Sequence, residues 1–283
     1  MVVDEAEAAR PARDREAAPL PLSAMGKEQL RRIAFVLTDI DDTLTNDGRL
    51  PGIAYSALER LSEAGLRVIP VTGRPAGWCD LIARLWPVSA VIGENGAFYF
   101  ARHPAGGMHR RFARPAHTRQ EDRKRLDSLA TTILSTVEGA RLSADQAFRE
   151  ADLAIDIAED GPHLTKTAVR RIVNCFEAAG AMAKVSSIHV NGWFGNYDKL
   201  TMARRLFEEM YGIDIDRENG RALFVGDSPN DAPMFGFFAN SVGVANFAAF
   251  CDEVETPPKY LTLAAGGSGF AELAEAILEA REG

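Results

Sequence analysis

Residues 33–43, IAFVLTDIDDT, hold a short apolar run that is followed at once by acidic and hydroxyl side chains. Such a run is typical of a strand buried in a parallel sheet, because both faces of the strand are covered. The acidic residues then form a loop at the carboxyl end of the strand, which is where open α/β sheets bind ligands. We therefore predict a strand at 33–38 and a loop at 39–49.

The residues around this strand alternate between helical and extended patterns. One helical pattern ends at Gly65, and the proline of Thr72-Gly73-Arg74-Pro75 suits the first turn of another helix. Further strands are predicted at 67–71, 90–92, 97–101, 222–225 and 241–244, and helices at 53–64, up to about 84, and at 199–211, 229–235 and 268–279. This alternation predicts an α/β fold with a doubly wound, Rossmann-like parallel-sheet core.

The middle of the chain has a different pattern. Two helical stretches, 118–137 and 163–179, are combined with predicted strands at 151–158 and 183–190. This order of elements indicates a separate α+β unit inserted into the core. We therefore predict a core domain at 31–101 and 191–283, an inserted α+β domain at 102–190 and an N-terminal extension at 1–30.

The composition limits the possible partners. The chain has 283 residues, of which 46% are hydrophobic and 25% charged, and its formal charge is −8. This balance is typical of a globular protein. Proteins that bind nucleic acids normally display a basic surface, so we predict no nucleic-acid partner. No run of 18 apolar residues occurs, so we also predict no membrane span.

The cysteines and the N-terminal segment predict a cytoplasmic protein. Cys79, Cys175 and Cys251 lie far apart and lack the spacing of a zinc site or a disulfide framework, so we interpret them as reduced thiols. Residues 1–30 are rich in Ala, Arg, Glu and Pro, which predicts a disordered extension, and Met25 is an alternative start. The composition leaves the oligomeric state open.

Four aspartates follow predicted core strands: Asp39, Asp41, Asp227 and Asp231. If the strands are neighbours, these carboxylates converge, and two like charges about 4 Å apart repel by roughly 4 kcal/mol at an effective dielectric near 20. A cation must hold them together. Oxygen ligands without nearby Cys or His favour a hard cation, so we predict a Mg²⁺ site.

The same residue types can perform phosphoryl transfer. Asp39 can attack phosphorus as a covalent nucleophile, which divides hydrolysis into two steps through an aspartyl phosphate. Asp41 can protonate the leaving alcohol and later take a proton from water. Thr72 can donate a hydrogen bond to the phosphoryl oxygens, and Lys199 at a predicted helix start supplies a fixed cation.

These residues, in this order, resemble the four motifs of the haloacid-dehalogenase-like phosphatase superfamily. The motifs are Asp39-x-Asp41-x-Thr43, Thr72, Lys199 and Gly226-Asp227-x-x-Asn230-Asp231, and they cover about residues 33–270. The resemblance implies that Asp39 is the nucleophile and Asp41 the acid/base. It also implies that Thr72 and Lys199 hold the phosphate.

The resemblance further implies a metal site for Mg²⁺. Its ligands would be Asp39, Asp227 and Asp41, the last through its backbone carbonyl. Asn230 and Asp231 would lie behind these ligands, where Asp231 orients either the metal site or Lys199.

The long insertion between Thr72 and Lys199 is similar to that of the subfamily with an α/β cap at this place. That subfamily includes sugar-phosphate phosphatases and phosphomannomutases. Residues 93–97, GENGA, and 266–272, GGSGFAE, are similar to stretches of mannosyl-3-phosphoglycerate and sucrose-phosphate phosphatases. Asn95 in the first stretch is therefore a candidate substrate-binding residue.

The cap contributes three more candidates for substrate binding. Alternation along the predicted strand 183–190 places Ser187, His189 and Asn191 on one face, opposite Ile188 and Val190. This face can look into the cleft or, on an edge strand, into solvent. Trp193 and Phe194 are better explained by packing at a hinge than by stacking on a sugar.

Simpler interpretations exist for several of these residues. Thr72 could cap the following helix, and Lys199 could be an ordinary exposed lysine. Asp42 and Asp47 are more typical of solvated loop carboxylates, and Arg74 is ambiguous for the same reason.

Together these patterns predict a Mg²⁺-dependent phosphatase that hydrolyses a small-molecule phosphoester, a sugar phosphate or a phosphorylated sugar acid, under a closing cap. One alternative is a phosphohexomutase that uses the same Asp39 but needs a cap able to hold a second phosphate. Another is a signalling receiver domain, whose motif order and size do not fit this chain.

Overall fold

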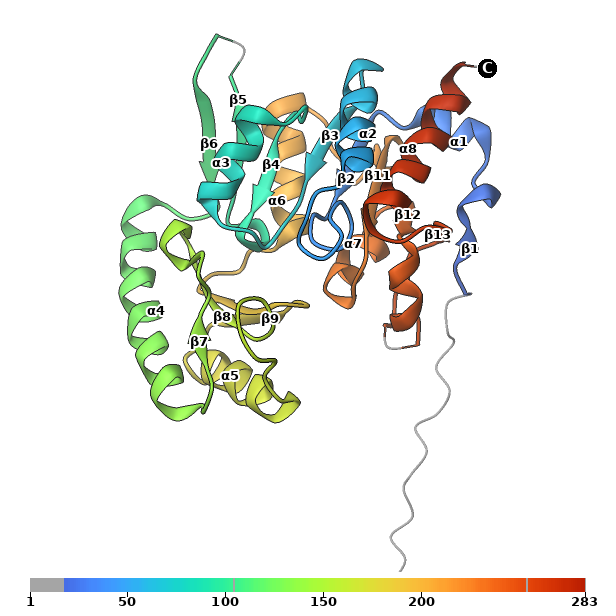
Figure 1. Cartoon of the computed structure of the whole chain (residues 1–283). Coiled ribbons are helices and arrows are strands. Elements are labelled where there is room, and N and C mark those ends of the chain that lie inside the picture. Colours follow the sequence, from blue (N-terminus) through green and yellow to red (C-terminus); the bar gives the residue numbers. More distant parts are fainter. Residues whose placement is uncertain (1–17, 104, 253, 283) are drawn as a thin grey trace, which may run out of the picture.

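The computed structural model describes residues 18–103, 105–252 and 254–282. A six-stranded parallel sheet forms the centre of the core (Figure 1). Its strands, in spatial order, are β1 (Leu20–Pro21), β13 (Tyr260–Leu261), β12 (Asn240–Gly243), β11 (Ala222–Gly226), β2 (Phe35–Thr38) and β3 (Arg67–Pro70). The α/β fold class predicted from the sequence is therefore confirmed.

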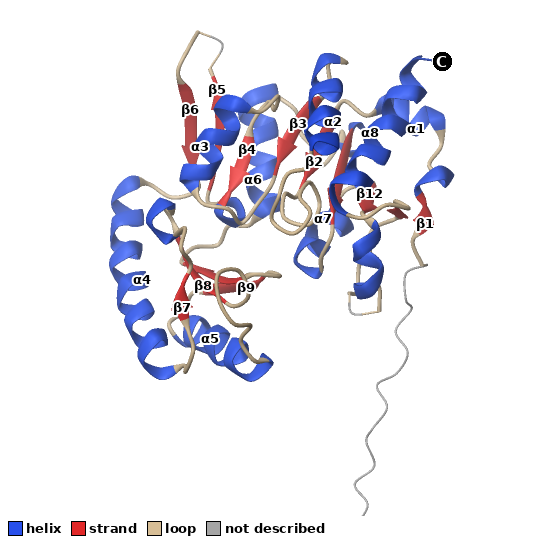
Figure 2. Cartoon of the chain, viewed as in Figure 1, coloured by secondary structure: helices blue, strands red, loops and turns tan. Residues whose placement is uncertain are grey.

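Helices cover both faces of this sheet (Figure 2). Along β2, Val36 faces one apolar cluster, whereas Phe35 and Leu37 face another, as the period of two in a strand requires. The cluster at Val36 includes residues of α1 (Lys27–Arg32), α2 (Gly52–Glu63), α3 (Ala76–Leu85) and α8 (Gly266–Glu282). The other cluster includes residues of α6 (Lys199–Leu206), the π-helical turn Phe207–Tyr211 and α7 (Ala232–Phe237).

Three antiparallel strands continue the core beyond β3. They are β4 (Val91–Gly93), β5 (Phe98–Arg102) and β6 (Met108–Phe112), and a bridge between Val71 and Ile92 joins them to the parallel sheet. We predicted that the inserted domain begins at residue 102, but β6 pairs with β5 and so belongs to the core. The sequence did not indicate β6, because the polar residues His109, Arg110 and Arg111 fill this edge strand.

The inserted domain, here called the cap, is an antiparallel sheet covered by two helices (Figure 1). The strands, in spatial order, are β7 (Arg141–Leu142), β8 (Asp152–Asp156), β10 (His189–Trp193) and β9 (Met182–Val185), and the helices are α4 (Ala116–Thr136) and α5 (Lys166–Ala178). Leu153, Ile155 and Val190 share an apolar cluster with residues of both helices. The alternate residues of β8 and β10 therefore lie on the opposite face of the sheet, away from the helices.

The start of the described chain differs from the sequence prediction. Residues 1–17 of the predicted disordered extension lie outside the described residues, but residues 20–30 are ordered. The N–H of Leu20 donates to the carbonyl of Lys259 at 2.9 Å, and Leu22, Met25 and Leu30 are buried in the core. The prediction was wrong here because the surrounding Ala, Pro and charged residues concealed these widely spaced apolar side chains. Within the described residues, no helix is both long and apolar enough to cross a bilayer.

The packing of α1 predicts a stability effect at Leu30. Truncation of a buried leucine removes apolar contacts and leaves a cavity, so Leu30→Ala is expected to lower the free energy of unfolding by about 2–5 kcal/mol. Lys27→Ala, on the exposed side of the same helix, is expected to change it by less than about 0.5 kcal/mol. Urea unfolding followed by circular dichroism measures both. Equal effects of the two substitutions would contradict the packing of α1 against the core.

Candidate active site

Two acidic loops meet at the carboxyl ends of β2 and β11. The strands pair in parallel, and the N–H of Asp39 donates to the carbonyl of Val225 at 2.9 Å. Asp227 follows directly after β11, and the hydroxyl of Thr43 donates to its Oδ1 at 3.2 Å. Residues far apart in the sequence thus meet because their strands are neighbours in the sheet.

Lys199 joins these loops from the start of α6. The carboxylate of Asp198 accepts from the N–H of Thr201 and caps this helix, which points Lys199 at the loops. Its Nζ donates to Oδ1 of Asp39 and to Oδ1 of Asp231, each at 2.8 Å. Burial by itself lowers the pKa of Lys199, but the two carboxylates hold the pKa above its ordinary value. The alternative of an exposed lysine is therefore contradicted.

The carboxylates of Asp39, Asp227 and Asp231 form a compact acidic group. Each offers an oxygen within 4.8 Å of the others, and all three side chains are buried. Burial, Asp231 and Asp41 raise the pKa of Asp39 to about 7, against the charge of Lys199. Burial, Asp39 and Asp231 raise the pKa of Asp227 to about 9.

Burial disfavours the ionised form of these carboxylates, the ionised carboxylates also repel one another, and one ammonium cannot neutralise three of them. A hard divalent cation that accepts carboxylate oxygens would relieve this repulsion, so the residues fit a Mg²⁺ ion. Asp39 and Asp227 of the predicted ligand set offer side-chain oxygens here. Asp231, predicted to lie behind the ligands, offers an oxygen to the same group and also holds Lys199.

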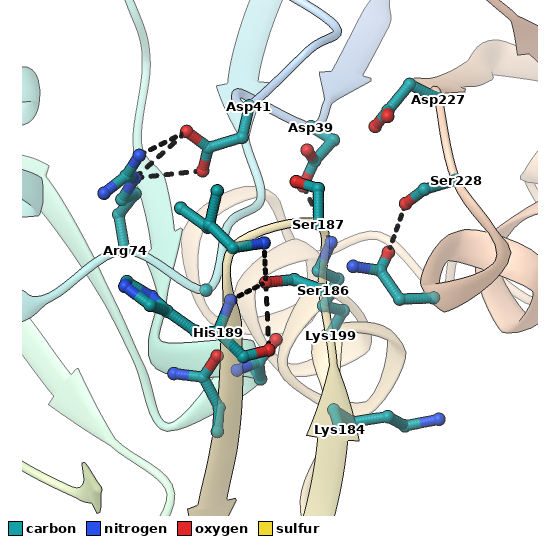
Figure 3. A pocket seen from close by; sticks show the side chains of 15 residues that line it. Asp39, Asp41, Arg74, Lys184, Ser186, Ser187, His189, Lys199, Asp227 and Ser228 are labelled. Atoms are coloured by element: carbon teal, nitrogen blue, oxygen red, sulfur yellow. Dashed lines mark hydrogen bonds and ion pairs between the residues drawn. The ribbon is translucent and has the colours of Figure 1, made fainter. Parts of the chain in front are cut away.

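Asp41 departs from the predicted convergence of four carboxylates. Its side chain is turned away from Asp39 and toward Arg74, as Figure 3 shows. Nε of Arg74 lies 3.0 Å from both carboxylate oxygens of Asp41, and Nη2 lies 2.7 Å from Oδ1. The ion pair with the forked guanidinium is more favourable for this carboxylate than a position among three like charges would be. Asp41 therefore lines the same pocket as Asp39 and Asp227, as predicted, but its carboxylate does not join their compact acidic group.

Arg74 also connects the core with the cap. Its Nη1 donates to Oε1 of Glu159 at 2.8 Å, and Oε2 of Glu159 lies 2.8 Å from Nε2 of His189. The close approach of His189 and the charge of Arg74 lower the pKa of Glu159 to about 2, although partial burial opposes this. The sequence left Arg74 ambiguous, and only its place directly after the Thr72-Gly73 strand end pointed to the site. No sequence pattern pointed to Glu159.

Thr72 does not lie where the sequence prediction placed it. Its side chain is fully buried, its N–H donates to the carbonyl of Ile92, and its hydroxyl accepts from the N–H of Arg74 at 3.0 Å. Among the described residues, those that line the pocket beside Asp39 do not include Thr72. Thr72 thus fixes the turn before α3, but it does not cap this helix as the alternative supposed, because the N-cap residue is Pro75.

The predicted cap residues do line the pocket beside Asp39. Ser187, His189 and Asn191 face it, together with Asn95 of the core. His189 and Asn191 of β10 alternate with Val190, which faces the cap helices. The predicted strand at 183–190 was wrong, because β9 ends at Val185 and Ser187 and Ile188 lie in the turn before β10, where both line the pocket. Nδ2 of Asn191 is already bound to the carboxylate of Asp152 at 2.9 Å.

Two further predictions concern residues around the pocket. Asn230 lines the pocket, and its Oδ1 accepts from the hydroxyl of Ser228 at 3.1 Å. Trp193 is almost fully buried and donates from Nε1 to the carbonyl of Tyr197, as the packing interpretation requires. Phe194 is buried in the apolar cluster of the cap.

A wider groove lies next to the pocket and shares Ser187 and Asn230 with it. Hydroxyl and amide side chains line it, together with the carboxylates of Asp42, Asp47 and Asp227. None of the described residues that line this groove is Lys, Arg or His. Asp42 and Asp47, which we interpreted as solvated loop carboxylates, therefore border a hollow large enough to matter for ligand choice.

Comparison with known proteins gives one family and several similar folds. A family model described as haloacid dehalogenase-like hydrolase matches residues 36–108. No curated protein matches the chain.

Solved structures cover nearly the whole of the described chain. The structure of Thermoplasma acidophilum 0175 has a TM-score of 0.67 at 20% identity, covering 87% of this chain and 98% of that one. A putative HAD/COF-like hydrolase from Plasmodium vivax has a TM-score of 0.64 at 18% identity, covering 89% and 99%. The sucrose-phosphatase of Synechocystis, solved with sucrose and phosphate, has a TM-score of 0.60 at 17% identity, covering 87% and 98%. At these identities the likeness shows a shared fold.

The acidic group predicts that Mg²⁺ stabilises the protein. At a Mg²⁺ concentration about 100 times its Kd, the gain in the free energy of unfolding is about 2.7 kcal/mol. Asp227→Asn is expected to lose most of this gain, while its metal-free melting temperature stays equal or rises because one repelling charge is gone. Differential scanning fluorimetry with and without MgCl₂ measures both effects.

A matched control is Asp214→Asn, which changes an exposed carboxylate paired with Arg217. This variant is expected to keep the full Mg²⁺ effect. The metal site is refuted if Asp227→Asn gains as much stability from Mg²⁺ as the unmodified protein does.

Proposed function

We propose, on the premise that the chain is a haloacid dehalogenase-like hydrolase, that it is a Mg²⁺-dependent phosphatase that hydrolyses a sugar phosphate through an aspartyl phosphate on Asp39. The observation that carries the proposal is the buried ammonium of Lys199 between Asp39 and Asp231, beside the carboxylate of Asp227. This arrangement fixes one oxygen of Asp39 and leaves the other for attack on phosphorus.

The first half-reaction transfers the phosphoryl group to the protein. Oδ2 of Asp39 forms a bond to phosphorus as the bond between phosphorus and the leaving oxygen breaks, and Asp41 gives a proton to that oxygen. Lys199 keeps Oδ1 of Asp39 in place and offsets negative charge during the transfer. Mg²⁺, held by Asp39 and Asp227, supplies the positive charge that the approach of an anionic phosphoryl group needs.

The second half-reaction regenerates the enzyme. Asp41, now ionised, takes a proton from water, and the water oxygen attacks phosphorus as the bond to Oδ2 of Asp39 breaks. Inorganic phosphate leaves, and Asp41 keeps the proton for the next cycle. Because both oxygens of Asp41 face Arg74, this role requires the side chain to turn from Arg74 toward the leaving oxygen.

The chemistry of the groove supports a neutral leaving group. Hydroxyl and amide groups such as Ser187, Asn46 and Asn246 can exchange hydrogen bonds with sugar hydroxyls. A sugar acid would bring its carboxylate close to Asp42 and Asp47, which repel it. Sucrose bound to the Synechocystis sucrose-phosphatase, a protein of similar fold, agrees with a sugar as leaving group.

The same lining argues against the phosphohexomutase alternative. A mutase has to hold a second phosphate while the first is returned, and this requires cationic side chains near the leaving group. The described residues that line the groove offer carboxylates and neutral groups instead, whereas the nearby cations Arg74 and Lys184, with His189, line the pocket beside Asp39. Hydrolysis is therefore the better supported reaction.

A panel of phosphorylated metabolites tests the activity. With Mg²⁺ present, neutral sugar phosphates are expected to release inorganic phosphate faster than phosphorylated sugar acids, and a chelator is expected to stop the release. An isomer that accumulates in place of inorganic phosphate would establish the mutase. Failure to hydrolyse any ester in a broad panel would leave the chain with a shared fold only.

Replacement of the nucleophile predicts a loss of turnover without loss of fold. Asp39→Asn removes the attacking carboxylate, so the rate of phosphate release is expected to fall at least about 10³-fold. The far-ultraviolet circular dichroism spectrum is expected to stay unchanged, because the amide has nearly the same shape. Asp214→Asn serves as the surface control and is expected to retain full turnover. An Asp39→Asn protein that turns over normally would exclude the aspartyl phosphate.

A further inference from the structure

The turn at residues 93–96 holds a buried hydrogen-bond donor without a partner beside the pocket. Asn95 lines the pocket together with Asp39 and Lys199, and its side chain is about nine-tenths buried. Among the described residues, none accepts a hydrogen bond from its Nδ2. A buried donor without a partner is costly, so this position indicates a partner that comes from outside the chain.

The backbone of this turn adopts a conformation that is rare for residues with side chains. The φ angles of Glu94 and Asn95 are 44° and 56°, and that of Gly96 is 104°. Consecutive left-handed residues other than glycine are unfavourable, and they persist only when their surroundings hold them. Asparagine tolerates this region better than most residues, which fits its presence at the middle position.

The carboxylate of Glu94 is what holds the turn. It is fully buried and accepts hydrogen bonds from four backbone N–H groups. One comes from Ala76 at the start of α3 at 2.9 Å, and the others come from Glu150, Ala151 and Asp152 at 2.9, 2.6 and 3.1 Å. Glu94 therefore anchors the turn both to the core and to the start of β8 in the cap.

The turn also lies directly on the start of α6. A Cβ atom on Gly96 would come within 2.0 Å of the carbonyl oxygen of Asp198 and within 2.8 Å of the nitrogen of Lys199. Only glycine permits this approach. As a result, the amide of Asn95 and the ammonium of Lys199 are held in one rigid frame.

The residue expected to donate to the phosphoryl group, Thr72, is fully buried and is not among the described residues that line the pocket beside Asp39. The hydroxyl of Thr72 faces the N–H of Arg74, and Nζ of Lys199 lies between two carboxylates. The side chain of Asn95 lies over Gly73, where a Cβ would be 3.3 Å from both Oδ1 and Nδ2 of Asn95. The absence of a side chain at Gly73 therefore leaves the amide room at the strand end.

We propose that Nδ2 of Asn95 donates a hydrogen bond to the phosphoryl oxygens of the substrate, and that Glu94 is the positioning residue for this contact. The inference rests on the proposed phosphatase function and assigns to Asn95 the role that was predicted for Thr72. A phosphoryl oxygen is a pure acceptor, which is what an unpaired amide donor requires.

Two substitutions separate this contact from a structural role of the turn. Asn95→Gly keeps the left-handed backbone and removes the donor, and Asn95→Asp also tolerates this backbone but replaces the donor with a charged acceptor. The measurement is the inhibition constant of inorganic phosphate, with Mg²⁺ present, against hydrolysis of the best ester found. Asn95→Gly is expected to raise the inhibition constant of phosphate about 10- to 100-fold, because hydrogen bonds to charged groups are the strong ones. Asn95→Asp is expected to raise it further, because its carboxylate also repels the phosphate.

Glu94→Gln tests the positioning role. In the unmodified protein this substitution is expected to weaken the binding of phosphate. In Asn95→Gly it is expected to have little further effect, because Glu94 acts through Asn95. Melting temperatures establish that each variant is folded.

Three outcomes overturn the proposal. One is unchanged phosphate inhibition in both Asn95 variants, which would make the turn purely structural. Another is a raised KM for the ester with unchanged phosphate inhibition, which would assign Asn95 to the leaving group. In both of these cases the unmodified protein still hydrolyses esters, so the proposed function stands. If the unmodified protein neither hydrolyses an ester nor binds phosphate, the proposed function fails as well.

Discussion

The ammonium of Lys199 between Asp39 and Asp231 is the interaction on which the site depends. It joins the loop after β2, the loop after β11 and the start of α6, which come from both sides of the cap in the sequence. All three side chains are buried, and loss of one partner from a buried ion pair typically costs about 3–5 kcal/mol. The cap can therefore be inserted between Thr72 and Lys199 only if the chain returns to this point.

The sequence was sufficient for the parts of the site that follow from strand order. Asp39 and Asp227 could be brought together because the carboxyl ends of neighbouring parallel strands meet, and this is observed. The side chain of Asp41 could not be placed, because its direction is set by a guanidinium from another strand end and not by periodicity. Strand β6 and the ordered segment at 20–30 were not predicted, because polar residues surround their few apolar side chains in the sequence.

The contact between cap and core is held by buried charges. Arg149 in the cap has a fully buried side chain that binds Asp145 and Asp152 and donates to the carbonyl of Gly73 at 2.9 Å. Gly73 belongs to the same strand end as Arg74, which binds Glu159 of the cap. Ionic contacts of this kind depend on geometry and add little net stability, so they define how the cap sits over the pocket more than how firmly the protein folds.

The charges of the site explain why an acidic pocket can accept an anion. The ionised carboxylates of Asp39, Asp227 and Asp231, with Lys199, leave a net charge of about −2, whereas Asp41 and Arg74 cancel each other. A phosphoryl dianion would be repelled by this set. Burial first and the neighbouring carboxylates second raise the pKa values of Asp39 and Asp227. A divalent cation brings the sum close to zero. The acidic group is then required to hold the metal. We propose that the anion is bound by neutral donors such as the amide of Asn95, because such donors add no charge to a site that is already balanced.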